Sequence, residues 1–72
     1  MTLNELKPGA CGRIVDWYEG MPDRLLEMGI LPGTLIEVIR LAPLGDPIAL
    51  KIKHGQLAIR RSDAARIIVE AV

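Results

Sequence analysis

The chain has 72 residues, half of them apolar, and its nine basic residues are balanced by nine acidic ones. A chain of this length buries only about 60% of the surface that its unfolded form exposes, so nearly every apolar side chain is needed for one core. The zero net charge excludes a long-range field that would attract nucleic acid or an anionic lipid surface. We therefore expect a single domain over residues 1–72 that binds no nucleic acid.

Cysteine usage and hydropathy favour a cytoplasmic protein. Cys11 is the only cysteine, so the chain forms no internal disulfide and has no zinc-type pairing of cysteine and histidine. The amino terminus lacks the basic and apolar stretches of a signal peptide, and no segment approaches the ~18 apolar residues of a membrane helix. We expect a reducing compartment and no direct insertion into a membrane.

A strand and a short helix are predicted first along the chain. Residues 9–18 are rich in β-branched and aromatic types without helical spacing, and Gly12 inside them suggests a bulge or a bend. Residues 22–28 predict a short helix, because Pro22 suits a first helical turn and Gly29 follows its end.

The helix is expected to turn Leu25 and Met28 toward the core, at three-residue spacing, with Leu26 as a further candidate. Pro32 and Gly33 come next. They suit the two central positions of a type II turn, because proline presets one backbone angle and glycine accepts the positive φ that follows.

The next strand, over residues 34–42, is apolar on both faces. Ile36 and Val38 occupy one face, and three apolar residues occupy the other: Leu35, Ile39 and Leu41. We expect the helix, or Leu3 and Leu6 from the amino terminus, to cover the second face. If it stays uncovered, it forms a groove for a partner segment or a surface for self-association.

The second half of the chain predicts a hairpin and a closing strand. Residues 47–53 alternate, with three side chains pointing inward: Ile48, Leu50 and Ile52. His54 and Gly55 predict the tight turn of the hairpin. Ser62 is expected to cap a single helical turn before a strand over residues 67–72.

These elements amount to about five short strands with a short helix between the first and the second. Too few strands are present for a two-sheet sandwich, so a small closed or half-closed barrel is the economical solution. The sequence therefore predicts a mainly β protein, a small SH3-like β-barrel.

The loop APLGDP, residues 42–47, interrupts two strand-like segments. A rigid turn accounts for four of its residues. Pro43 and Pro47 lack a backbone N–H donor, Gly45 allows a sharp reversal of the chain, and the side chain of Asp46 can accept hydrogen bonds. The turn does not account for Leu44, an apolar side chain at the apex, where loop residues normally face water. Leu44 either is a lone exposed leucine or meets a partner.

Three stretches, RLLEMGILPGT, RLAPLGDPIAL and LAIRRSDAARIIVE, occur in an order and spacing that closely resemble FeoA, the small cytosolic component of bacterial ferrous-iron transport. The likeness extends from Leu6 to Glu70. It implies an SH3-like β-barrel without enzymatic activity that associates with FeoB, the membrane transporter whose cytosolic portion carries a GTP-binding domain. The same barrel type occurs in iron-dependent repressors, but this chain has no room for their helix-turn-helix portion.

We expect a partner surface on the short helix, the turn after it and the 42–47 loop. Its candidate residues are Leu26, Met28, Pro32, Pro43, Leu44, Gly45, Asp46 and Pro47. No serine, histidine and acid stand in a plausible triad order, so we expect no catalytic residue and no enzyme.

The alternative function is direct binding of ferrous iron or another transition metal. His54 is the only histidine and is expected to be solvated in its hairpin, and Cys11 is expected to be a small buried residue. Acidic residues and histidine do not cluster at a recognisable ligand spacing, so the sequence predicts no metal site and no cofactor.

Overall fold

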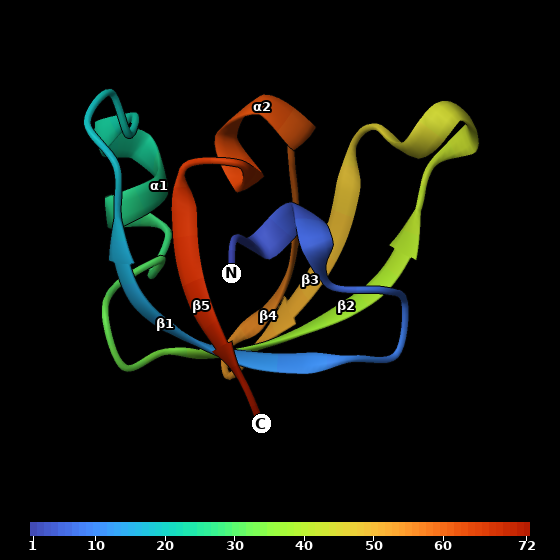
Figure 1. Ribbon diagram of the computed structural model, residues 1–72, viewed down its shortest axis with the longest axis horizontal. Helices are drawn as coiled ribbons and strands as arrows, with labels where there is room; N and C mark the ends of the chain where they lie inside the picture. The colour runs from blue at the N-terminus through green and yellow to red at the C-terminus, as the bar shows by residue number, and fades with distance from the viewer.

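The computed structural model describes residues 1–72 as a curled antiparallel sheet with short helices at its rim (Figure 1). The sheet has five strands: β1 (Cys11–Trp17), β2 (Leu35–Leu41), β3 (Ile48–Ile52), β4 (Gly55–Ile59) and β5 (Ile67–Ala71). They pair in the order β4-β3-β2-β1-β5. Because β4 and β5 do not pair, the barrel is half-closed, one of the two outcomes that the sequence predicts.

Four short helical segments accompany the strands: η1 (Leu3–Glu5) precedes β1, and α1 (Asp23–Glu27), η2 (Pro43–Gly45) and α2 (Arg61–Ala64) lie between strands. The helix α1 lies between β1 and β2, as predicted. Figure 1 shows α1, α2 and η2 along one rim of the barrel. None of the helices has the length and apolar character needed to span a membrane.

The end of α1 is fixed by a glycine in the left-handed region. Gly29 has a φ of 98° and donates its N–H to the carbonyl of Leu26, while the next residue, Ile30, donates to the carbonyl of Leu25. This is the Schellman pattern, which satisfies carbonyls at the end of a helix. Leu25 and Ile30 are both buried, so the cap also attaches α1 to the core.

Every strand and the amino-terminal segment contribute residues to the core. It contains thirteen buried apolar residues: Leu3, Leu6, Ile14, Leu25, Ile30, Ile36, Val38, Ile48, Leu50, Ile59, Ala64, Ile67 and Val69. The inward positions predicted for β2 and β3 are confirmed, except that Ile52 is only half-buried. Leu3 and Leu6 enter the core, so they do not cover the outer face of β2, which was one of the two alternatives expected for that face. Leu35 on that face is 51% exposed.

Gly12 does not form a bulge, one of the two features that the sequence suggests at this position. The irregularity in the pairing of β1 with β5 lies between Ile14 and Asp16. At Gly12 a β-carbon would come within 3.0 Å of a terminal methyl of Leu6, and 3.3 Å of the carbonyl oxygen of Glu70. The glycine therefore allows the amino-terminal segment to pack closely on the strand.

Two turn predictions need correction in detail. The hairpin turn consists of Lys53 and His54, since Gly55 already pairs with Ile52 as the first residue of β4. Ser62 lies within α2 and does not cap it, because the helix begins one residue earlier and its N-cap position is Arg60, with no side-chain hydrogen bond.

Candidate functional site

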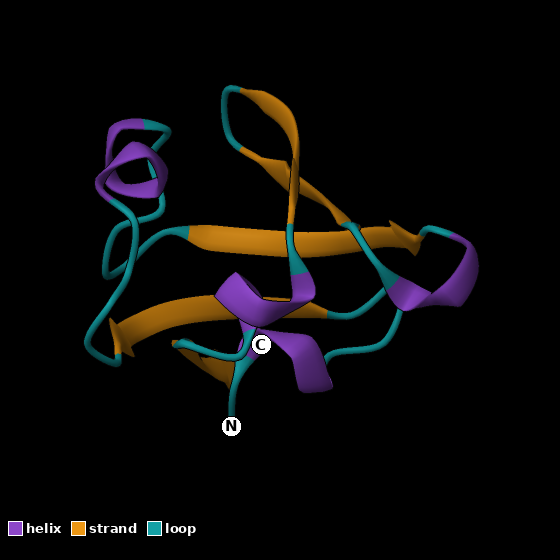
Figure 2. Cartoon of the chain, turned by 90° about the horizontal axis from the view of Figure 1, so that it is seen from above, coloured by secondary structure: helices purple, strands orange, loops and turns teal.

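The residues predicted to bind a partner lie at the two ends of one rim (Figures 1 and 2). Leu26, Met28 and Pro32 belong to α1 and the turn after it, whereas Pro43–Pro47 form the loop that contains η2. Between these ends lies α2. The structure thus brings the predicted residues onto one rim and divides them into two separate groups.

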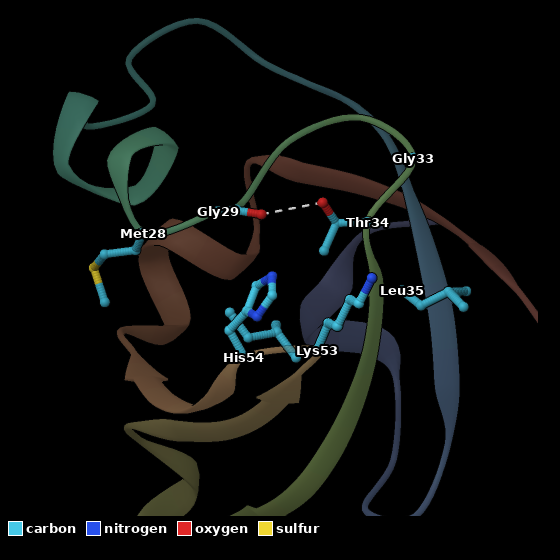
Figure 3. A pocket seen from close by; sticks show the side chains of 8 residues that line it. Met28, Gly29, Gly33, Thr34, Leu35, Lys53 and His54 are labelled. Atoms are coloured by element: carbon cyan, nitrogen blue, oxygen red, sulfur yellow. Dashed lines mark hydrogen bonds between the residues drawn. The ribbon is translucent and has the colours of Figure 1, made fainter.

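A groove of about 520 Å³ opens beside the end of α1 (Figure 3). Eight residues line it: Met28, Gly29, Gly33, Thr34, Leu35, Ile52, Lys53 and His54. We call this the Met28 groove. Met28 is 42% exposed, so the prediction that it faces the core was wrong. It occupies the C-cap position of α1, where the chain leaves the helix, and its side chain lies at one side of the groove (Figure 3).

The turn between α1 and β2 is held rigidly at the wall of the Met28 groove. Gly33, with a φ of 92°, donates its N–H to the carbonyl of Ile14 at 2.7 Å, and the N–H of Thr34 bonds to the carbonyl of Leu31 at 3.1 Å. The hydroxyl of Thr34 donates to the carbonyl of Gly29 at 3.1 Å (Figure 3). The predicted turn over Pro32 and Gly33 is confirmed, and it fixes one wall of the groove.

The opposite wall comes from the tip of the β3–β4 hairpin. In Figure 3 the side chains of Lys53 and His54 lie between Met28 on one side and Leu35 on the other. A shallower hollow of about 340 Å³ shares Leu35, Ile52 and Lys53 with the groove and extends toward Cys11. Cys11 is exposed, which corrects the expectation that it is buried. The region combines apolar contact area with a lysine charge, a composition suited to an apolar or acidic segment of a partner.

The loop at the other end of the rim is anchored at its base. The N–H of Ala42 bonds to the carbonyl of Pro47 at 3.1 Å, and that of Gly45 to the carbonyl of Ala42 at 2.7 Å. The carboxylate of Asp46 accepts a hydrogen bond from the backbone N–H of Arg61 at 3.0 Å. Asp46 thus accepts a hydrogen bond, as predicted, but from the first amide of α2 and not from an amide of the loop, and this bond attaches the loop to the start of α2.

Leu44 stands at the apex of this anchored loop with its side chain fully exposed, at 104% of the reference value. Its backbone has φ 73° and ψ 5°, and it is the only residue other than glycine with a positive φ. This conformation costs an L-residue roughly 1–2 kcal/mol. A strained backbone that presents an exposed apolar side chain is a feature of binding loops.

An ion pair connects the two helices of the rim. Arg24 of α1 lies 3.3 Å from the carboxylate of Asp63 in α2, and Asp63 is only 9% exposed. Sequence reasoning missed this pair, because 39 positions separate its members and no local pattern links them. It also missed Thr34 and Lys53 in the groove. The one available signal was the apolar outer face of β2, which includes Leu35.

No three histidine, cysteine, aspartate or glutamate side chains are grouped closely enough to hold a metal ion. His54 lies at the Met28 groove and Cys11 at the adjoining hollow. The structure therefore brings neither residue into a cluster of ligands.

A family model and several known proteins match this chain. The model of the FeoA domain matches residues 1–71. An Fe(2+) transport protein A/Fe(2+) transporter FeoB fusion protein from Porphyromonas gingivalis (strain ATCC BAA-308 / W83) is 41% identical over 75 residues. That match covers 100% of this chain and 9% of the fusion protein, so the chain spans about a tenth of the length of this curated relative.

Solved structures of related proteins have the same fold. An FeoA-like protein from Clostridium acetobutylicum superposes with a TM-score of 0.92 at 32% identity, covering 100% of this chain and 86% of that one. The zinc complex of FeoA from Stenotrophomonas maltophilia, described as an SH3 domain protein, gives 0.81 at 25% identity, covering 97% and 89%. The predicted SH3-like fold is confirmed. With matches across nearly its whole length, the chain belongs to the FeoA family, whose small accessory domains are associated with ferrous-iron transport.

Proposed function

We propose that this protein is a non-enzymatic, cytoplasmic accessory protein of ferrous-iron uptake that binds the cytosolic, GTPase-containing region of a FeoB-type transporter. The observation that supports this proposal most directly is the fusion protein from Porphyromonas gingivalis, in which a domain 41% identical to this chain is part of one polypeptide with the transporter. Covalent linkage keeps two modules at a high effective concentration, up to the millimolar range for short linkers. Such a linkage is useful where the two modules act by binding to each other.

A protein without chemistry of its own can regulate a transporter only by binding some of its states more tightly than others. A tenfold difference in affinity between two nucleotide states shifts their equilibrium by about 1.4 kcal/mol. The rim supplies two candidate contact areas: the Met28 groove and the 42–47 loop with Leu44 at its apex. Their exposed apolar side chains can contact a partner while the residues of the core stay buried.

Binding of the purified protein to the transporter's cytosolic domain tests this proposal. We expect association by calorimetry in the presence of GDP or a non-hydrolysable GTP analogue, with affinities that differ at least several-fold between the two. Differential affinity is the only route to regulation that a non-enzymatic partner has. Lack of association in every nucleotide state, together with normal iron uptake after deletion of the gene, would overturn the proposal.

A second candidate function is direct binding of ferrous iron or another transition metal. It is favoured by one specific observation, the crystal structure of the FeoA protein from Stenotrophomonas maltophilia in complex with zinc. In this chain the one imidazole, of His54, lies beside Lys53 at the groove, and the lysine charge opposes a nearby cation.

Anaerobic titration of the isolated protein with ferrous iron and with zinc separates the two functions. We expect no saturable one-to-one binding, because a stable site for either metal needs several ligands that converge in space. Stoichiometric binding that is lost in His54→Ala, and kept in a Lys7→Ala control, would favour the metal-binding function instead.

A further inference from the structure

The sheet has two edges, and only one of them is covered. Along β5, the N–H of Val69 bonds to the carbonyl of Met1 at 2.9 Å, and Thr2 forms a bridge with Ile68. The chain's own amino terminus therefore acts as a short added strand there. The opposite edge, β4, pairs only with β3. No backbone group of Gly55–Ile59 takes part in a backbone hydrogen bond outside the strand ladder.

The pairing shows which groups of β4 point outward. The two-residue turn makes Ile52 and Gly55 a directly bonded pair, and bonded and non-bonded pairs alternate along an antiparallel ladder. Gln56 and Ala58 therefore direct their N–H and C=O groups away from β3. Both residues are exposed. In Figure 2 the β3–β4 hairpin projects from the rest of the sheet, which leaves this edge accessible.

The edge of β4 lacks the features that normally prevent strand addition. Exposed edges are usually blocked by a charged residue, a proline or a bulge. The sequence of β4, GQLAI, contains no charge and no proline, and its register with β3 runs from Gly55 to Ile59 without a shift. It is thus a regular strand of five residues, spanning roughly 17 Å, with free hydrogen-bonding groups.

Positive charge borders this edge at both ends. Lys53 precedes β4 in the turn, and Arg60 and Arg61 follow it; none of the three takes part in an ion pair. Between Arg40 and Arg61 the chain has five lysine or arginine residues and a single acid, Asp46. Asp46 already accepts a hydrogen bond from the backbone of Arg61.

These charges argue against a second copy of the chain as the occupant. If two β4 strands paired antiparallel, Lys53 of each copy would face the Arg60 and Arg61 end of the other. Parallel pairing would place identical charges beside each other. Like charges in either arrangement oppose pairing. A strand with acidic residues at both ends would meet no such repulsion in either orientation.

We propose that the free edge of β4 binds an extended polypeptide segment as a sixth strand, and that this segment carries acidic residues on both sides of an uncharged, strand-forming middle. The N–H and C=O groups of Gln56 and Ala58 hold its backbone, as in other cases of strand addition. The flanking acids face Lys53 at one end and Arg60 and Arg61 at the other. This surface shares Lys53 with the Met28 groove and Arg61 with α2, but its hydrogen-bonding groups belong to β4, so the proposal does not depend on the identity of the rim's partner.

Amide hydrogen exchange of the ¹⁵N-labelled protein tests the proposal residue by residue. The probe is a synthetic peptide with alternating threonine and valine in its middle and paired glutamates at both ends. In the free protein, the amide of Leu57 should be protected and those of Gln56 and Ala58 should exchange fast. Saturating peptide should slow exchange at Gln56 and Ala58 by several-fold to about tenfold, the gain expected from one added hydrogen bond.

A peptide with lysines in place of the glutamates is the matched control and should give no protection. Arg60→Glu should weaken binding of the acidic peptide at least several-fold, whereas Lys7→Glu, with the same change in net charge on the loop before β1, should not. Ala58→Pro, which removes an outward N–H, should abolish binding while the spectrum stays that of a folded domain.

Two results would overturn the proposal. The first is equal or absent protection of Gln56 and Ala58 with the acidic and basic peptides. The second is protection that depends on protein concentration without any peptide, which would make a second copy of the chain the occupant.

Discussion

Leu3→Ala should lower the free energy of unfolding by about 2–5 kcal/mol, the cost of removing a fully buried leucine side chain. Leu3 has no exposed surface, and η1 packs against α2 and β5. Native proteins have roughly 0.05–0.15 kcal/mol of stability per residue, so this loss is a large fraction of the total for so short a chain. Urea unfolding followed by the fluorescence of Trp17 would measure it.

Leu44→Ala is the matched control, since it removes the same atoms from a fully exposed position. It should change the free energy of unfolding by no more than about 0.5 kcal/mol. If Leu3→Ala cost no more than this control, the amino terminus would only lie on the barrel and would not be part of its core.

The elements of this fold were predictable wherever a local signal specifies them. The alternation of residues 47–53 predicts β3, and Pro22 and Gly29 predict the bounds of α1 to within one residue, because both act on the backbone at their own positions. A closed or half-closed barrel follows from the number of strands. None of these predictions requires knowledge of distant contacts.

The errors concern residues whose surroundings come from distant parts of the chain. Leu3 and Leu6 are buried where the amino-terminal segment packs against α2 and β5, contacts that composition does not reveal. Gly12 has the signature of a bulge, yet its lack of a side chain serves the close approach of Leu6. Met28 has core spacing on an ideal helix, but α1 ends at the residue before it.

The candidate site was predictable in its parts and not in its arrangement. The sequence marked both the α1 turn and the 42–47 loop as surfaces. It carried no information on their separation along the rim, or on the placement of α2 between them by the Arg24–Asp63 pair. The Met28 groove also needs the hairpin tip, which is remote in sequence from α1.

Leu44→Gly should weaken binding to the transporter's cytosolic domain at least tenfold, or about 1.4 kcal/mol, without loss of stability. Glycine adopts a φ near 73° without strain, so the free energy of unfolding should stay equal or rise by up to about 1 kcal/mol. The two opposite changes, measured by calorimetry and urea unfolding, separate a binding role for Leu44 from a structural one. Leu44→Met, which keeps an apolar side chain, should retain affinity.

A combination with Met28→Ala shows whether one partner contacts both ends of the rim. Met28 ends α1 and Leu44 lies in η2, and these two elements lie at opposite ends of a molecule about 27 Å long. Their effects on binding should therefore add to within about 0.5 kcal/mol. Additive losses would mean that the partner spans α2 and contacts the groove and the loop together. If Leu44→Gly bound as tightly as the unmodified protein, the loop apex would not contact the partner, and the Met28 groove alone would remain as the rim's contact area.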